Sequence, residues 1–343
     1  MPNLPSRPDL EQLRRQAKEL LRAARGGDVA ALRRIHAVSD RFVLASAQLA
    51  LAREHGFESW PALRIEVLRR EVLDSGDPAR LRALLGEDPA LAVASMANWC
   101  DHPMGALPLG YVAMMRYDTA RRVWRDVPGA GTLALALIEA GAPVDGEPGD
   151  SETPLITAAS YGDAAVARVL VEAGADVDAH ATMDSGGVPG GTALLHAAVF
   201  GMTGVIDVLV AAGARPASLE EAAAAGDLRG LLTPPSDLQT RVRALVMAAD
   251  HQRLEVIDEL LAAGTPIDET DSEWGRHPLR LAAQGGRAAG VEHLLARGAD
   301  PNLRDAEHGR TPLECCRQAR AGIVDQRSHD RVEAILEPVT SAD

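Results

Sequence analysis

The sequence predicts an all-α solenoid of stacked helix-turn-helix units joined by finger loops. Three observations support this fold class. A Thr-Pro-Leu motif followed by an Ala pair and a glycine recurs along the 343 residues, at a spacing of 34 between the copies that begin at His277 and Thr311. Apolar residues recur at helical spacing after each such glycine. Aromatic residues make up only 3% of the chain, too few for a conventional globular core, whereas Ala- and Leu-rich stacked helices need few.

Each part of the motif has a structural role in a helix pair. Thr153 is expected to cap the start of the first helix, with Pro154 at the first helical position, where its missing N–H costs nothing. The pair Ala158-Ala159 allows close helix packing, and Gly162 permits a tight turn into the second helix. Further copies begin at Thr192, His277 and Thr311, with a degenerate copy at Arg243.

The second helix of each unit is predicted to bury one apolar face. In the first clear copy this face is formed by Val166, Leu170 and Val171, and equivalent apolar residues recur in the later copies. A glycine closes each helix and suits a left-handed C-cap. Because the apolar faces recur in register, they are expected to be buried between adjacent units. The closing glycines are Gly141, Gly174, Gly213, Gly264 and Gly298.

The motif and its period resemble the ankyrin-repeat family. The resemblance implies an array over residues 93–338, with a short tail at 339–343 and a divergent helical cap at 1–92. Within the cap, Ser59 is expected to cap a helix that begins near Pro61. The segment 52–61 resembles a stretch found ahead of ankyrin repeats in bacterial proteins.

Three insertions interrupt the repeat period. They lie at 116–131, between the helices of one unit, at 180–191, in a Gly-rich finger, and at 233–239, which contains Pro234-Pro235. Insertions in a solenoid often mark the working face, although neutral drift in exposed loops is also common. We expect 180–191 to contribute to binding and 116–131 to lie at the opposite edge.

The net charge of −14 and the pI of about 5.2 bear on the class of partner. Nucleic acid and anionic membranes reward clustered Lys and Arg, so neither is expected as a partner. No apolar stretch approaches the length of a membrane span, and the N-terminus lacks a signal-peptide core. Three cysteines, two of them adjacent, do not form a disulfide framework, which favours a cytoplasmic location.

The sequence contains no recognisable catalytic motif, phosphate loop or cofactor-binding pattern, so no catalytic residue and no cofactor are predicted. Cys100, Asp101 and His102 could supply a metal ligand or a nucleophile with its base. Adjacent residues rarely converge on one ion, so a finger loop with a Trp anchor is favoured there. Cys316 falls where the repeat places a small buried residue, which favours an inert structural role and no metal.

With no catalytic or metal site predicted, we expect the chain to function through a surface that binds a partner. In ankyrin proteins the fingers and first helices line a concave face, and the resemblance places aromatic and apolar residues there, ringed by finger residues. The candidate partner-binding residues are Tyr111, Met115, Tyr161 and Phe200 as anchors, and Trp99, Asp101, Glu152, Asp184 and Trp274 around them. The alternative is that Tyr161 and Phe200 only pack between repeats.

The sequence therefore predicts a protein-interaction module that binds a neutral or basic protein or peptide, and leaves the oligomeric state open. The alternative is a small-molecule-binding protein or enzyme with a pocket between residues 98–118 and the 180–191 finger.

Overall fold

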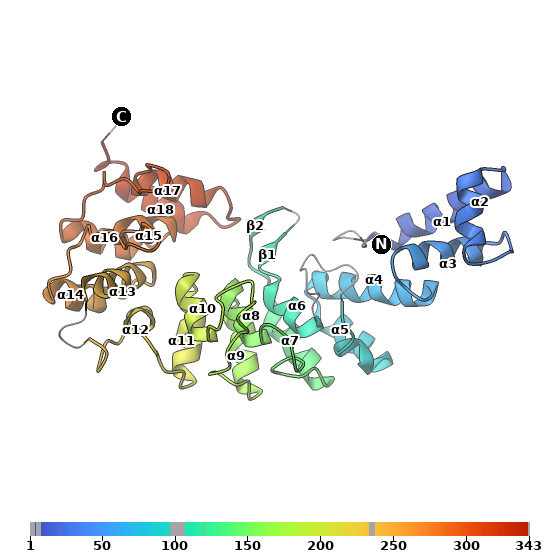
Figure 1. The fold of residues 1–343 in the computed structure, drawn as a ribbon, viewed down its shortest axis with the longest axis horizontal. Coiled ribbons are helices and arrows are strands. Elements are labelled where there is room, and N and C mark those ends of the chain that lie inside the picture. Colours follow the sequence, from blue (N-terminus) through green and yellow to red (C-terminus); the bar gives the residue numbers. More distant parts are fainter. Residues whose placement is uncertain (1–3, 5–7, 97–106, 120, 233–236, 342–343) are drawn as a thin grey trace. The chain divides into compact units, whose positions relative to one another are not determined.

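The computed structural model describes residue 4 and residues 8–96, 107–119, 121–232 and 237–341. These residues form helices almost throughout, with one two-stranded hairpin, so the predicted all-α class is confirmed (Figure 1). The chain divides into two compact units, which we describe separately. The first comprises Met1–Val112 and Thr132–Pro143, and the second comprises Ala113–Gly131 and Val144–Asp343.

The first unit begins with a small helical cluster. Asp9 caps its first helix by accepting from the amides of Glu11 and Gln12, and Ser59 caps α4, as predicted, by accepting from Ala62 N at 3.2 Å. The elements are α1 (Leu10–Arg25), α2 (Val29–His36), α3 (Leu44–Glu54), α4 (Trp60–Ser75), α5 (Pro78–Glu87), the 3-10 helix η1 (Pro89–Ala92), and most of α6 (Pro108–Met114) and α7 (Ala130–Glu139).

Packing in the first unit combines a small-residue core with one buried arginine. Ala17, Ile35 and Ala47 are fully buried where α1, α2 and α3 meet. Arg69 of α4 is buried too, and its guanidinium donates to the carbonyls of Leu91 and Ala94 at 2.8 and 2.7 Å. The same group pairs with Glu66 at 2.6 Å, so its charge is neutralised inside the unit.

The second unit contains the repeats. First helices pack on first helices, as α8 on α10, α13 on α15 and α15 on α17, and second helices pack on second helices, as α9 on α11 and α16 on α18. The elements are β1 (Tyr117–Asp118), β2 (Val123–Trp124), α8 (Pro154–Tyr161), α9 (Ala164–Glu172), α10 (Ala193–Val199), α11 (Thr203–Ala211), α12 (Leu219–Ala225), α13 (Leu238–Asp250), α14 (Leu254–Ala262), α15 (Pro278–Gln284), α16 (Ala288–Ala296), α17 (Pro312–Arg320) and α18 (Arg327–Leu336).

The repeat motif folds as the sequence predicts. Thr153 Oγ1 accepts from Ile156 N at 3.2 Å, and Gly162 ends the helix with φ of 71°, a left-handed conformation that favours glycine. Val166 and Leu170 of α9 are fully buried, and the equivalent Leu209, Leu260 and Leu294 are buried as well. One unit departs from the pattern: α12 is followed by a turn over 228–231 and not by a second α-helix.

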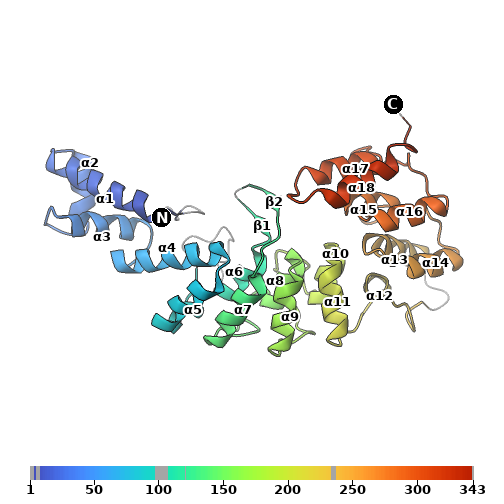
Figure 2. The same cartoon turned by 180° about the vertical axis from the view of Figure 1, so that it is seen from behind.

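The 116–131 insertion folds into the β1–β2 hairpin, with Tyr117 opposite Trp124 and Asp118 opposite Val123. The hairpin reaches the loop between α17 and α18, as both views show (Figure 2). Trp124 N donates to Gly322 O at 2.9 Å, and Val324 N donates to Trp124 O at 3.1 Å. We call residues 117–124 and 322–324 the clasp, because they connect an early insertion of the second unit to its last helix pair.

Candidate protein-binding surface

Tyr161, at the end of α8, lies against the hairpin. Its ring centroid is 6.1 Å from that of Trp124, and Trp124 is in turn 5.1 Å from Tyr117. Arg116, at the base of the hairpin, donates to Gly162 O in the turn that follows Tyr161. The insertion was expected at the edge opposite the 180–191 finger, away from the residues predicted to bind a partner. Instead, the hairpin packs against Tyr161 and the turn that follows it.

Phe200, at the end of α10, is the exposed aromatic residue of the next repeat. Its side chain is 41% exposed, and its ring meets the edge of His196 at 6.1 Å. His196 itself is fully buried. The buried His196 ring lies next to Phe200 and is hydrogen-bonded to Ser160 of the preceding repeat.

His196 makes that connection through both ring nitrogens. Nε2 lies 3.1 Å from the carbonyl of Val188, which can only accept, so we assign the proton to Nε2. Nδ1 then accepts from the hydroxyl of Ser160 at 2.8 Å. Burial lowers the pKa of His196, against the opposing effect of Glu152, so the ring is held neutral as a structural crosslink.

The 180–191 finger is folded onto itself and onto the preceding finger. Ala181 N donates to Gly191 O at 2.9 Å, and Thr182 N donates to Ser151 O at 2.9 Å. Ser185 Oγ donates to Glu152 Oε1 at 2.5 Å, so Glu152 helps to hold the finger. Asp184 is exposed and accepts from Thr182 Oγ1 at 2.6 Å. The finger is thus ordered by hydrogen bonds within it and by hydrogen bonds to the preceding finger.

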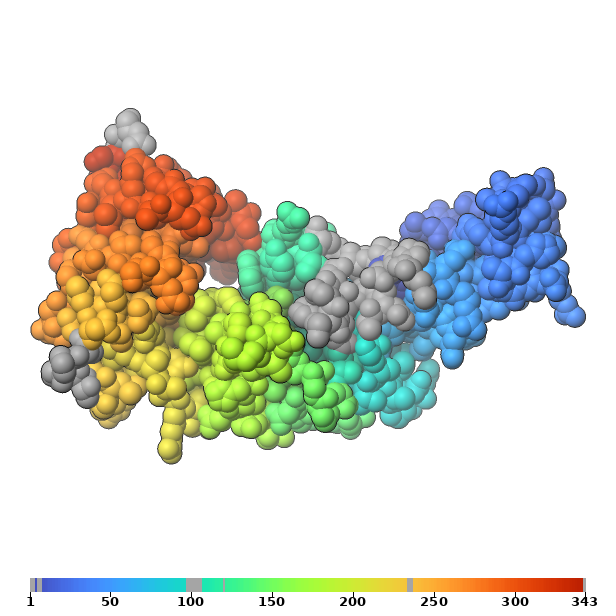
Figure 3. Space-filling view, in the orientation of Figure 1, coloured from blue at the N-terminus to red at the C-terminus, as the bar shows by residue number. Residues whose placement is uncertain are grey.

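These contacts define an aromatic surface made of Tyr117, Trp124, Tyr161 and Phe200. Tyr117, Trp124 and Tyr161 are half-buried and Phe200 is exposed. The hairpin that carries Tyr117 and Trp124 projects from the repeats in the space-filling view (Figure 3). Neither residue was among the sequence candidates, because both lie in an insertion without repeat register. Their only sequence signal was the presence of two aromatic residues in a chain that has few.

The other candidates lie in different surroundings. Tyr111 is buried in the first unit, where its hydroxyl donates to Asp74 at 2.6 Å and the Arg70 guanidinium lies 4.1 Å above its ring. Met115 is buried in the second unit. Trp274 is 38% exposed in the finger before α15. Trp99 and Asp101, with the neighbouring Cys100 and His102, lie outside the described residues.

Comparison with known proteins identifies the fold family. The model of the ankyrin-repeat family matches residues 129–218 and 219–325, more than half of the chain. The chain belongs to the ankyrin-repeat family.

Among solved structures, the chain is similar to the human ASB11 ankyrin repeat domain, with 20% identity and a TM-score of 0.37. The similarity covers 78% of this chain and 96% of that domain. A search of curated protein sequences finds no significant match. Ankyrin repeats are in general modules of protein–protein interaction.

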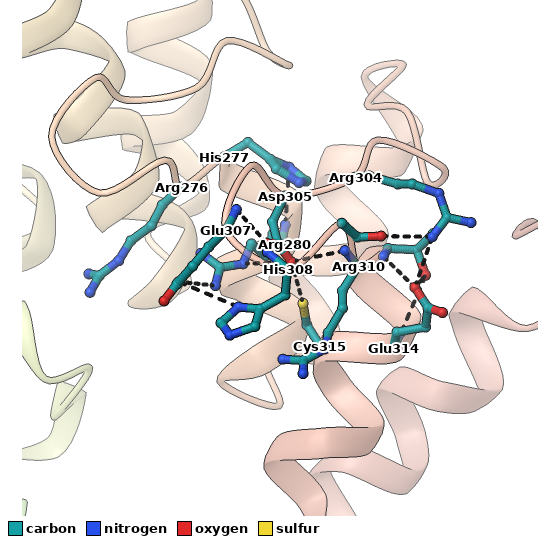
Figure 4. A network of polar contacts seen from close by, with 12 residues as sticks. Arg276, His277, Arg280, Arg304, Asp305, Glu307, His308, Arg310, Glu314 and Cys315 are labelled. Atoms are coloured by element: carbon teal, nitrogen blue, oxygen red, sulfur yellow. Dashed lines mark hydrogen bonds and ion pairs between the residues drawn. The ribbon is translucent and has the colours of Figure 1, made fainter.

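The ankyrin finger that precedes α17 is built around a buried carboxylate, that of Asp305 (Figure 4). Asp305 accepts from the amides of Glu307, His308 and Arg310 at 3.0, 2.6 and 3.2 Å. Burial alone raises the pKa of Asp305, but these amides and the nearby Arg280 guanidinium outweigh it and lower the pKa. The carboxylate therefore stays charged and organises the finger.

Cys315 and Cys316 lie next to that finger, at the start of α17. Both are buried free thiols, and Cys316 occupies the small-residue position predicted for it. Sγ of Cys315 lies 3.6 Å from Asp305 Oδ2, and Sγ of Cys316 lies 3.5 Å from His329 O. Burial raises the pKa of Cys316 to about 11. Such a thiol is a poor nucleophile.

In the part of the chain that the structure describes, no group of three or more His, Cys, Asp and Glu side chains is arranged to hold a metal ion. Over the same residues, no helix of this ankyrin protein combines the length and apolarity needed to span a bilayer.

Proposed function

We propose that this ankyrin protein binds another protein or peptide through the aromatic surface, on the concave face of the array. The observation that carries the proposal is a pair of aromatic contacts in consecutive repeats, Trp124 with Tyr161 and His196 with Phe200. The hydrogen bond from Ser160, next to Tyr161, to His196 links the two contacts. Aromatic side chains that are held rigidly and partly exposed are favoured anchors at protein interfaces, because they supply a large contact area at low entropic cost.

The aromatic side chains of this surface are held in fixed positions by hydrogen bonds beneath and beside them. The His196 ring is hydrogen-bonded to Ser160 on one side and to the carbonyl of Val188 on the other. Because this ring is fixed, the side chain of Phe200 that contacts it is also held in place. Trp124 is anchored on the other side by its backbone bonds to Gly322 and Val324. A partner would therefore meet side chains whose positions are already determined, which reduces the ordering cost of binding.

The charge of the chain supports a neutral or basic ligand. Asp184 is exposed on the finger, whereas Asp126 at the base of the hairpin is paired with Arg116 at 3.1 Å. Residues 113–200, which include the hairpin, the finger and both repeats, contain 12 Asp and Glu against 5 Arg, so the local charge is acidic. An acidic rim steers neutral or basic segments toward the aromatic anchors and disfavours polyanions.

The test is partner capture from the native host followed by quantitative binding of the captured partner. Phe200→Ala and Tyr161→Ala should each weaken binding by about 1 kcal/mol or more, with helical circular dichroism unchanged. The matched control is Val210→Ala: Val210 lies on α11 of the same repeat and is 40% exposed, nearly the same as Phe200. Equal binding by all three variants would reject the proposal.

A further inference from the structure

The N-terminal helices carry a charge opposite to that of the rest of the chain. Residues 1–75 contain 13 Lys and Arg against 10 Asp and Glu, whereas residues 76–343 contain 22 against 39. The net charges are therefore +3 and −17. At physiological ionic strength charges are screened over about 8 Å, so the local excess, not the total charge, determines what binds to these helices.

A groove lies between α2 and α3 within this cationic region. It is open to solvent, has a volume of about 740 Å³ and is lined by Ala37, Val38, Leu49 and Ala50 together with charged residues. The small apolar residues form a surface that can accept an aliphatic side chain. A groove of this volume holds a few residues of an extended peptide.

Three arginines line the groove, and they differ in their pairing. Arg34 is neutralised by Glu54, through two hydrogen bonds of 2.7 Å from Nε and Nη2. The side chains of Arg33 and Arg53 are exposed, and neither guanidinium has a hydrogen bond or ion pair among the described residues. Two guanidinium groups are thus available next to an apolar surface. A guanidinium matches a carboxylate in charge and shape, because its planar fork donates two parallel hydrogen bonds.

We propose that the α2–α3 groove binds an acidic peptide segment of a partner protein, in which carboxylates flank an aliphatic residue. The carboxylates pair with Arg33 and Arg53, and the aliphatic side chain lies on Val38 and Leu49. This surface is separate from the aromatic surface and takes ligands of the opposite charge. Nucleic acid fits less well, since its affinity depends on many phosphate contacts and the groove offers only two unpaired cations.

The test uses the full chain and a short fluorescent peptide in which two glutamates flank a leucine. Arg33→Ala and Arg53→Ala should each weaken peptide binding about tenfold, the effect of losing one charge-assisted hydrogen-bonded pair. The control Arg64→Ala removes the same charge from an exposed position on α4, outside the groove, and should leave the affinity unchanged. A peptide with glutamines in place of the glutamates should bind weakly.

Several outcomes would overturn the proposal. The first is an Arg64→Ala effect as large as the other two, because attraction would then be nonspecific. The second is equal affinity for the glutamine peptide, and the third is no binding of the glutamate peptide at all. Binding of anionic vesicles or duplex DNA in place of the peptide, lost in the Arg33→Ala and Arg53→Ala variants, would assign the groove to a different class of partner.

Discussion

His277 makes the stability of the array depend on pH in a way that a single substitution can remove. It occupies the helix-cap position that Thr153 and Thr311 occupy in other repeats, and its Nδ1 accepts from Arg280 N at 3.4 Å. The side chain is 1% exposed. Burial, and next the charge of Arg280, lower the pKa of His277 to about 4.

The sign of the effect follows from this lowered pKa. Between about pH 6.5 and pH 4, this histidine is protonated in the unfolded chain, where its pKa is about 6.5, but stays neutral in the folded protein. The free energy of unfolding therefore decreases as the pH falls from about 6.5 toward 4. With these two pKa values, the free energy of unfolding decreases by about 2 kcal/mol between pH 7 and pH 5. His277→Thr restores an uncharged cap and should remove that loss.

The assay is urea unfolding of the wild-type protein and of the His277→Thr variant, monitored by circular dichroism at pH 7 and at pH 5. The two proteins should have similar midpoints at pH 7, and the variant should be more stable by about 2 kcal/mol at pH 5. His277→Asn supplies a second uncharged cap and should behave in the same way. If the stability difference between variant and wild type is the same at both pH values, His277 is not a buried neutral group.

Three other predictions concern packing, thiol reactivity and the clasp. Leu170→Ala should destabilise the array by about 2 to 4 kcal/mol in urea melts, because Leu170 is fully buried between repeats; a negligible change would contradict the repeat register. Cys316 should resist alkylation, read by peptide mass spectrometry, until the protein unfolds, and rapid labelling in the native state would show that the site is accessible. Val324→Pro removes the amide that donates to Trp124 O and should cost about 1 kcal/mol or more, whereas Val324→Ala keeps that amide and serves as the control.

Most of the repeat fold could be predicted from the sequence because its determinants are local and periodic. The cap at Thr153, the left-handed Gly162 and the buried Leu170 depend on neighbours within a few positions or in the adjacent repeat. Each therefore leaves a regular signal in the sequence. Even Cys316 could be predicted as buried, from its position in the repeat.

The candidate site was less predictable, because its geometry depends on contacts without a period. Trp124 meets Tyr161 and the 322–324 loop through an insertion whose path no repeat register describes. The sequence suggested Tyr111 as a partner-binding anchor, yet the residue is buried and its hydroxyl donates to Asp74, on a helix outside the repeat pattern. His196 became part of the site only because the long finger folds back over it.

The clasp also bears on the order in which the protein folds. Trp124 and Ile323 are paired although about 200 residues separate them, and closing a loop of that length in an unfolded chain costs about 5 kcal/mol of entropy. Two backbone hydrogen bonds, at about 1 kcal/mol each, do not recover that cost. The intervening repeats must therefore be stacked before the pairing becomes favourable. Slow hydrogen exchange at the Trp124 amide would then show, from a single position, that every repeat between Trp124 and Ile323 has folded.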